Sequence, residues 1–239
     1  MLREAEKLAF DWEQGRREGG IQDLISAAHA NRISEAVLAV VGEPDAEQCL
    51  RRMADKSVNL SSRTPSQGKD ALWELDLLSF MRRRGVTAIL KDPPDILADF
   101  GFGDYPLACK KVYSEKGVEA QMRKGVKQLS GFGGAGLVAF NIDDLVPESV
   151  VLQSRSQNDA SDFLANLNRS FIERHQMRLQ RFVTEGRCDG VLVATSILAD
   201  IANSSQRFNN FLQVTIWTLS EMDVARRSRL DVVRTAFVN

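Results

Sequence analysis

The chain has 239 residues, 44% of them hydrophobic and 26% charged, and a formal net charge of −1. These values exclude a disordered chain, and no apolar run approaches the ~18 residues of a membrane-spanning helix. The near-neutral charge weakens the case for a duplex-DNA binder, which usually has a clear basic excess, but a local basic patch would suffice. The charged N-terminus has no signal-peptide core, and the three cysteines form no CxxC pair. We therefore expect a cytoplasmic protein without a zinc site or a disulfide framework.

The first part of the chain is expected to be helical. Apolar residues recur at helical spacing between Leu24 and Val41, and glycine-containing segments interrupt the pattern. The polar residues 57–68 read as a loop. We therefore predict a helical N-terminal extension over residues 1–60 and a main domain over residues 61–239. The extension could attach a protein partner or a second copy of the chain.

The main domain alternates helical and extended segments. In chain order, the pattern predicts a helix over 69–84, extended segments at 86–90, 95–98 and 107–112, a helix over 117–129, a strand at 137–142, a helix over 159–184 and strands at 188–196 and 212–219. The remaining residues read as a polar tail. This order predicts an α/β fold with a mixed central β-sheet flanked by helices.

A glycine-rich segment, GFGGAG, occupies residues 131–136. It lacks the Lys-Ser/Thr ending of a P-loop, and it precedes a predicted strand, whereas phosphate-binding glycine loops precede a helix. We therefore expect a flexible connection at this position.

Four residues between 74 and 128 stand in an order that resembles the PD-(D/E)XK (restriction-endonuclease-like) nuclease superfamily. Glu74 lies on a predicted helix, Asp95 follows Pro94 at the start of a strand, Lys110 lies on the next strand, and Gln128 lies on the helix after it. The superfamily core runs helix, three strands, helix, strand, and its motif is an Asp after a Pro followed by acid-any-Lys on the next strand. The resemblance covers roughly residues 69–142.

The resemblance implies a divalent-metal-dependent nuclease acting on DNA, with Mg²⁺ or Mn²⁺ as its cofactor. Asp95, Glu74 and the backbone carbonyl of Cys109 would then hold the metal, because Mg²⁺ prefers hard oxygen ligands. Lys110 would orient the attacking water and stabilise charge on the phosphate, and Gln128 would complete the set. Nucleases of this kind serve in restriction and antiphage defence, among other processes.

The motif acid should stand at position 108, where this sequence has Ala108. Strand alternation places residues 108 and 110 on one face, so an acid at 108 would lie beside Lys110 and Asp95. Three explanations stay open. The chain could be an engineered inactive variant, a naturally degenerate member that binds without cutting, or a member whose acid has moved to another position, with the candidates being Asp76, Asp99 and Asp104.

Basic residues around the motif are candidates for phosphate contacts. They are Lys111 on the motif strand and Arg123, Lys124 and Lys127 on the helix that follows. Each motif residue also has a plain structural alternative, such as a turn cap for Asp95 or a surface ion pair for Glu74. The competing hypothesis for the whole chain is a non-enzymatic module that binds nucleic acid or protein on a degenerate nuclease fold.

Overall fold

The computed structural model describes residues 6–7, 10–11, 13–15, 20–147, 150–205 and 208–238. The helices have the following bounds: α2 (Ile21–Leu38), α3 (Glu47–Asp55), α4 (Gln67–Arg83), α5 (Val118–Leu129), α6 (Gln157–Thr184) and α7 (Val224–Val238). The strands are β1 (Thr87–Lys91), β2 (Asp95–Asp99), β3 (Asp104–Lys111), β4 (Leu137–Asn141), β5 (Val151–Ser154), β6 (Gly190–Ile201) and β7 (Phe208–Trp217). No helix among these residues is long and apolar enough to cross a membrane.

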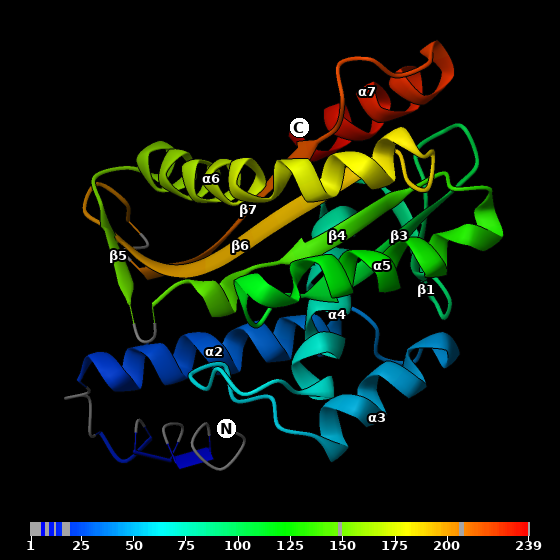
Figure 1. The fold of residues 1–239 in the computed structure, drawn as a ribbon. Coiled ribbons are helices and arrows are strands. Elements are labelled where there is room, and N and C mark those ends of the chain that lie inside the picture. The colour runs from blue at the N-terminus through cyan, green and yellow to red at the C-terminus, as the bar shows by residue number, and fades with distance from the viewer. Residues whose placement is uncertain are drawn as a thin grey trace.

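The seven strands form one mixed sheet in the order β1-β2-β3-β4-β6-β5, with β7 on the other edge of β6 (Figure 1). Strands β1 to β3 are joined antiparallel, whereas β3, β4 and β6 run parallel, and β7 returns antiparallel to β6. The predicted α/β class with a mixed sheet is confirmed. The order helix, three strands, helix, strand predicted for residues 69–142 is the one observed from α4 to β4.

Helix α4 lies between one face of the sheet and the helices α2 and α3 (Figure 1). It is buried on nearly all sides, as expected for a helix with apolar neighbours on two sides. Its Trp73 indole N–H donates to the carbonyl of Ala139 at 3.0 Å, which fixes the helix against β4. Val40 of the segment after α2 and Met53 of α3 belong to the same hydrophobic cluster as α4. Residues 21–55 therefore share the main core.

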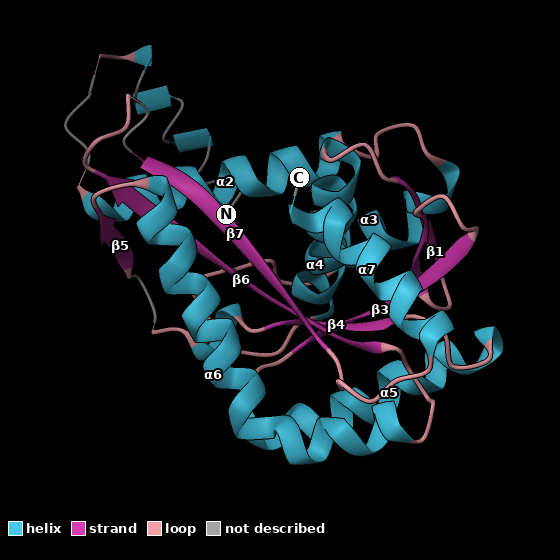
Figure 2. Ribbon diagram, turned by 90° about the horizontal axis from the view of Figure 1, so that it is seen from above, coloured by secondary structure: helices cyan, strands magenta, loops and turns pink. Residues whose placement is uncertain are grey.

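Helices α5 and α6 cover the opposite face of the sheet (Figure 2). Their apolar sides meet the sheet in a second cluster, in which Val126, Phe140 and Phe171 are fully or almost fully buried. The exposed sides of both helices carry most of their charged residues. The two clusters make a three-layer arrangement of helices, sheet and helices.

The C-terminal residues form helix α7, so the prediction of a polar tail is wrong. Leu230, Val233 and Phe237 recur at helical spacing. They are buried in the hydrophobic cluster on the α4 side of the sheet, here called the α4-side cluster. The ring of Phe237 stacks on Phe80 of α4 at a centroid distance of 5.8 Å. Four arginines among these positions hid the apolar stripe in the sequence. Strand β5 was not predicted either, since its four residues are too few to show a pattern.

The glycine-rich segment serves close approaches between chain segments. A Cβ on Gly134 would lie 2.1 Å from the carbonyl oxygen of Gly186, and one on Gly136 would lie 2.3 Å from that of Pro106. Both glycines also have positive φ angles, which other residues rarely adopt. Gly134 and Gly136 are therefore explained by packing and backbone conformation.

Candidate functional site

A pocket of about 510 Å³, here called the site pocket, opens where β2 and β3 meet α4 and α5. Glu74, Asp95, Lys110 and Gln128 all line it, although they come from four different elements and span 55 residues of sequence, from 74 to 128. The backbone of Cys109 lies at the same pocket. The structure thus brings together the residues that the motif order selected.

Asp95 stands at the centre of this group. Its Oδ2 accepts hydrogen bonds from the Cys109 amide at 2.7 Å and from the Lys110 ammonium at 2.9 Å, and its Oδ1 accepts one from the Gln128 amide at 2.9 Å. Burial raises the pKa of Asp95, and the Lys110 charge opposes that rise. Asp95 is therefore a buried carboxylate whose charge is balanced chiefly by one ammonium group.

The backbone of Asp95 has a φ of 137°, and it is the one described non-glycine residue with a positive φ. Such a conformation costs of order 1–3 kcal/mol, and residues that adopt it cluster at functional sites. It occurs at the first residue of β2, directly after Pro94. The strained position is consistent with a side chain that is held in place for chemistry or binding.

Glu74 is held by Arg52, a residue that the sequence did not single out. The Arg52 guanidinium donates to both carboxylate oxygens of Glu74, at 3.0 Å to Oε1 and through a second, shorter contact to Oε2. Burial, with a further contribution from the charge of Asp95, raises the pKa of Glu74 to about 7. The pair joins α3 to α4 across 22 residues of sequence, and no local motif predicts such a contact.

Ala108 is fully buried in the second cluster, between the sheet and helices α5 and α6, which we call the α5-side cluster. Cys109 belongs to the α4-side cluster on the opposite face. The antiparallel register of β2 and β3 pairs Ile96 with Leu107, and continuing it by one residue brings Asp95 opposite Ala108. Opposite residues of an antiparallel pair share a face, with Cβ atoms roughly 5 Å apart. A carboxylate at position 108 would therefore start beside Asp95, but Ala108 itself does not line the site pocket.

The residues present do not fit a preformed divalent-cation site. Both oxygens of Glu74 are engaged by Arg52, and both oxygens of Asp95 are engaged by Lys110, Cys109 and Gln128. Within the described residues, no group of three or more metal-ligating side chains comes together. One observation favours a ligand at this place. Gln128 Oε1 is a buried acceptor beside Asp95, and no donor in the described part of the chain binds it.

The four candidate phosphate contacts differ in availability. Lys111 is buried, and its ammonium is paired with Asp144 at 2.7 Å, so its charge is already balanced. Arg123 is exposed and paired with Glu119 of its own helix. Lys124 and Lys127 are exposed at the edge of the site pocket and form no ion pair with any described residue. Lys124 and Lys127 are therefore the two lysines most available to an anion.

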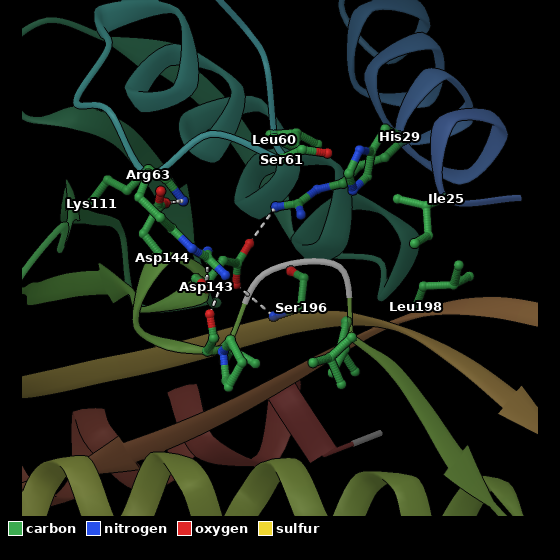
Figure 3. Close-up of a pocket in the computed structure, with 15 residues that line it drawn as sticks. Ile25, His29, Leu60, Ser61, Arg63, Lys111, Asp143, Asp144, Ser196 and Leu198 are labelled. Atoms are coloured by element: carbon green, nitrogen blue, oxygen red, sulfur yellow. Dashed lines mark hydrogen bonds and ion pairs between the residues drawn. The ribbon is translucent and has the colours of Figure 1, made fainter. Parts of the chain in front are cut away.

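A second, smaller cavity of about 80 Å³, here called the small pocket, lies beneath α2 (Figure 3). Asp143 and Asp144 line it together with Arg32, Arg63 and Lys111. Arg32 bridges Asp143 at 3.0 Å and Asp76 on α4, while Arg63 donates to the carbonyl of Asp143 at 2.9 Å. These ionic groups are used in joining α2 and the 60–66 loop to the carboxyl ends of the central strands.

Comparisons with models of known protein families, with curated proteins and with solved structures find no match to this chain.

Proposed function

We propose that the chain has a nuclease core of the PD-(D/E)XK kind whose metal-dependent phosphodiesterase site lacks one carboxylate, at position 108. The observation that supports the proposal most is the convergence of Glu74, Asp95, Lys110 and Gln128 on one pocket, from the elements that the motif assigns to them. Surface pairs and turn caps would be expected to scatter over the molecule. The expected substrate is DNA, and the expected setting is restriction or antiphage defence in the cytoplasm.

Position 108 explains why this form of the site would be inactive. Alanine offers no oxygen there, and Arg52 already engages both oxygens of Glu74, so a divalent cation would have Asp95 as its one carboxylate ligand among the motif residues. A carboxylate at 108 would add a second negative charge next to Asp95, which favours a divalent cation over the single ammonium of Lys110. The completed site would use the metal to polarise the phosphate and to activate water.

The second candidate function is a metal-independent binding module for nucleic acid or protein. A specific observation favours it, because each of the two pocket carboxylates has its own cation in Arg52 or Lys110. A site neutralised in this way can hold a ligand through its remaining cations without any metal. If the chain is such a binding module, a carboxylate at position 108 will not create a metal site.

The test is a cleavage assay of this chain beside the variants Ala108→Glu and Ala108→Gln. Glutamine has the shape of glutamate without its charge, so it is the matched control for filling position 108. The substrates are plasmid, linear and single-stranded DNA and RNA, each with Mg²⁺, Mn²⁺ or EDTA. A thermal unfolding curve of each variant establishes that it folds.

We expect Ala108→Glu to cut DNA in the presence of metal and not in EDTA, while the chain itself and Ala108→Gln remain inactive. Adding Lys110→Ala or Asp95→Ala to Ala108→Glu should abolish the cutting. A folded Ala108→Glu protein that cuts none of these substrates would contradict the nuclease proposal and favour the binding module.

A further inference from the structure

A band of cations runs from the site pocket over α5 to α6. Successive residues of an α-helix are turned by about 100°, so Gln128, Lys124, Lys127 and Arg123 follow one another around α5 in steps of about 40–60°. Gln128, Lys124 and Lys127 all line the site pocket. Arg123 lies farthest from the pocket, beside Glu119. The exposed side of α5 is therefore basic from the pocket to its border with α6.

Helix α6 continues the band. Its Arg181 lies 3.3 Å from Glu119 of α5, and Arg174 lies 2.8 Å from Glu115 in the turn before α5. Arg178 lies between these two arginines along α6 and forms no ion pair with any described residue. We call this surface the cationic band, and its charged members are Arg123, Lys124, Lys127, Arg174, Arg178, Arg181 and Arg187, with the carboxylates Glu115, Glu119 and Glu185 among them.

The charge of the cationic band is unusual for this molecule. Cations outnumber carboxylates in it by more than two to one, whereas the whole chain has a net charge of −1. The carboxylates are shared between arginines, since Glu119 binds both Arg123 and Arg181. They therefore hold the arginine side chains in place on the surface and leave a positive excess. A local excess of this kind attracts a polyanion even when the protein is neutral overall.

We infer that the cationic band binds the backbone of a double-stranded nucleic acid and leads one strand into the site pocket. This inference rests on the proposed function and identifies the form of nucleic acid and the surface that holds it. Two adjacent helices span roughly 20 Å, which corresponds to about six base pairs at 3.4 Å each. The continuity of the band with Lys124 at the pocket favours a long polyanion over an isolated phosphate.

The duplex form follows from what the surface offers. Proteins that hold single strands stack the unpaired bases on aromatic side chains. None of the described residues that line the site pocket is aromatic, and none of the residues that define the cationic band is aromatic. Contacts of this kind are made to phosphates and carry no sequence information. The binding is therefore independent of base sequence and strongly dependent on salt.

The test measures binding of a fluorescein-labelled DNA duplex of random sequence. Fluorescence anisotropy is recorded in EDTA over a series of salt concentrations. The variant combines Lys124→Gln, Lys127→Gln and Arg178→Gln, three exposed cations of the band. The matched control combines Arg83→Gln, Arg227→Gln and Arg234→Gln, which remove the same charge from α4 and α7, outside the residues that define the band. Circular dichroism establishes that both proteins are folded.

We expect the band variant to bind duplex at least about 100-fold more weakly at 0.1 M salt and to lose about 2–3 units from the slope of log affinity against log salt. The control should stay within about threefold of the unchanged chain. Tighter binding of the same sequence as a single strand, or an equal loss in the control, would overturn the inference. Binding to vesicles rich in phosphatidylserine without binding to duplex would also overturn it and would indicate a membrane surface as the partner.

The result is separate from the outcome at position 108, because binding is measured on the chain with Ala108 and without metal. Duplex binding through the band together with an inactive Ala108→Glu protein would support the inference and contradict the nuclease proposal. If Ala108→Glu cuts DNA and the three band substitutions do not weaken that cutting, the nuclease proposal is supported and the inference about the band is contradicted.

Discussion

The site pocket and the small pocket are built from the same kinds of charged side chains, but the ion pairs are arranged differently in the two pockets. In the small pocket the ions are shared, since Asp144 pairs with both Lys69 and Lys111, and Arg32 pairs with both Asp76 and Asp143. In the site pocket the pairs are separate, with Arg52 on Glu74 and Lys110 on Asp95. The site pocket has about six times the volume of the small pocket and has unpaired lysines at its edge.

This difference separates ions that hold the fold together from ions that could meet a ligand. A shared and largely buried network leaves no charge for a ligand, and its removal would leave buried ions without partners. Separate pairs beside an open volume can exchange one partner for a ligand. Lys111 lines both pockets, but its ammonium pairs with Asp144 and so belongs to the shared network. Substitutions in the two pockets test this division.

The first prediction concerns Asp144, whose side chain is 3% exposed. Asp144→Asn leaves the ammonium groups of Lys69 and Lys111 buried without a carboxylate, so the free energy of unfolding should fall by about 3–5 kcal/mol. Urea denaturation measures it. Asp231→Asn, at an exposed pair on α7, is the control and should change stability by less than about 1 kcal/mol. A loss below about 1 kcal/mol for Asp144→Asn would contradict the structural role of the shared network.

The second prediction concerns Glu74 and pH. Its carboxyl ionises near pH 4.5 in the unfolded chain, but burial raises the pKa to about 7 in the folded chain. Between these values the folded chain keeps a proton that the unfolded chain has released, so stability falls as the pH rises. At pH 7 this group lowers the free energy of unfolding by an amount on the order of a few kcal/mol.

Glu74→Gln removes this group, so its stability should decline less steeply than that of the unchanged chain between pH 4.5 and 7. The measurement is urea denaturation of both proteins at a series of pH values. Parallel curves over this range would show that the Arg52 pair balances the burial of Glu74 completely.

The third prediction concerns Asp95 and has the smallest expected effect. Asp95→Asn should change the free energy of unfolding by less than about 1 kcal/mol, because burial raises the pKa of this carboxyl and its charge adds little stability. Asp95→Ala, which removes the acceptors for the Cys109 and Gln128 amides, should cost about 1–3 kcal/mol. Equal losses in the two variants, measured by urea denaturation, would indicate that Asp95 is a structural ion.

The sequence predicted the core elements well because their signals are local. Apolar spacing marked α4 and α6, and the prolines before Asp95 marked the start of β2. Strand alternation predicted that Ala108 and Cys109 lie on opposite faces of β3, and the two residues do belong to different hydrophobic clusters. Helix α7 was missed because its buried residues are few and stand among arginines.

The missing parts of the site are contacts between distant residues. Arg52 meets Glu74 across 22 residues and Lys69 meets Asp144 across 75 residues, and neither pair follows a spacing rule. Lys111 illustrates the same limit, since a lysine at a strand end reads as an exposed phosphate contact until its carboxylate partner is known. Tertiary pairing decides which charges remain available.

The most direct test of the central claim is the affinity of position-108 variants for Mn²⁺, measured by isothermal titration calorimetry at neutral pH. The claim predicts binding by Ala108→Glu with a dissociation constant in the millimolar range or tighter, and none by Ala108→Gln or the unchanged chain. Ala108→Asp is a second carboxylate variant in case the longer side chain disturbs the buried position. If folded Glu and Asp variants bind Mn²⁺ no better than Ala108→Gln, position 108 is not the missing ligand and the account of the site pocket as an incomplete metal site is wrong.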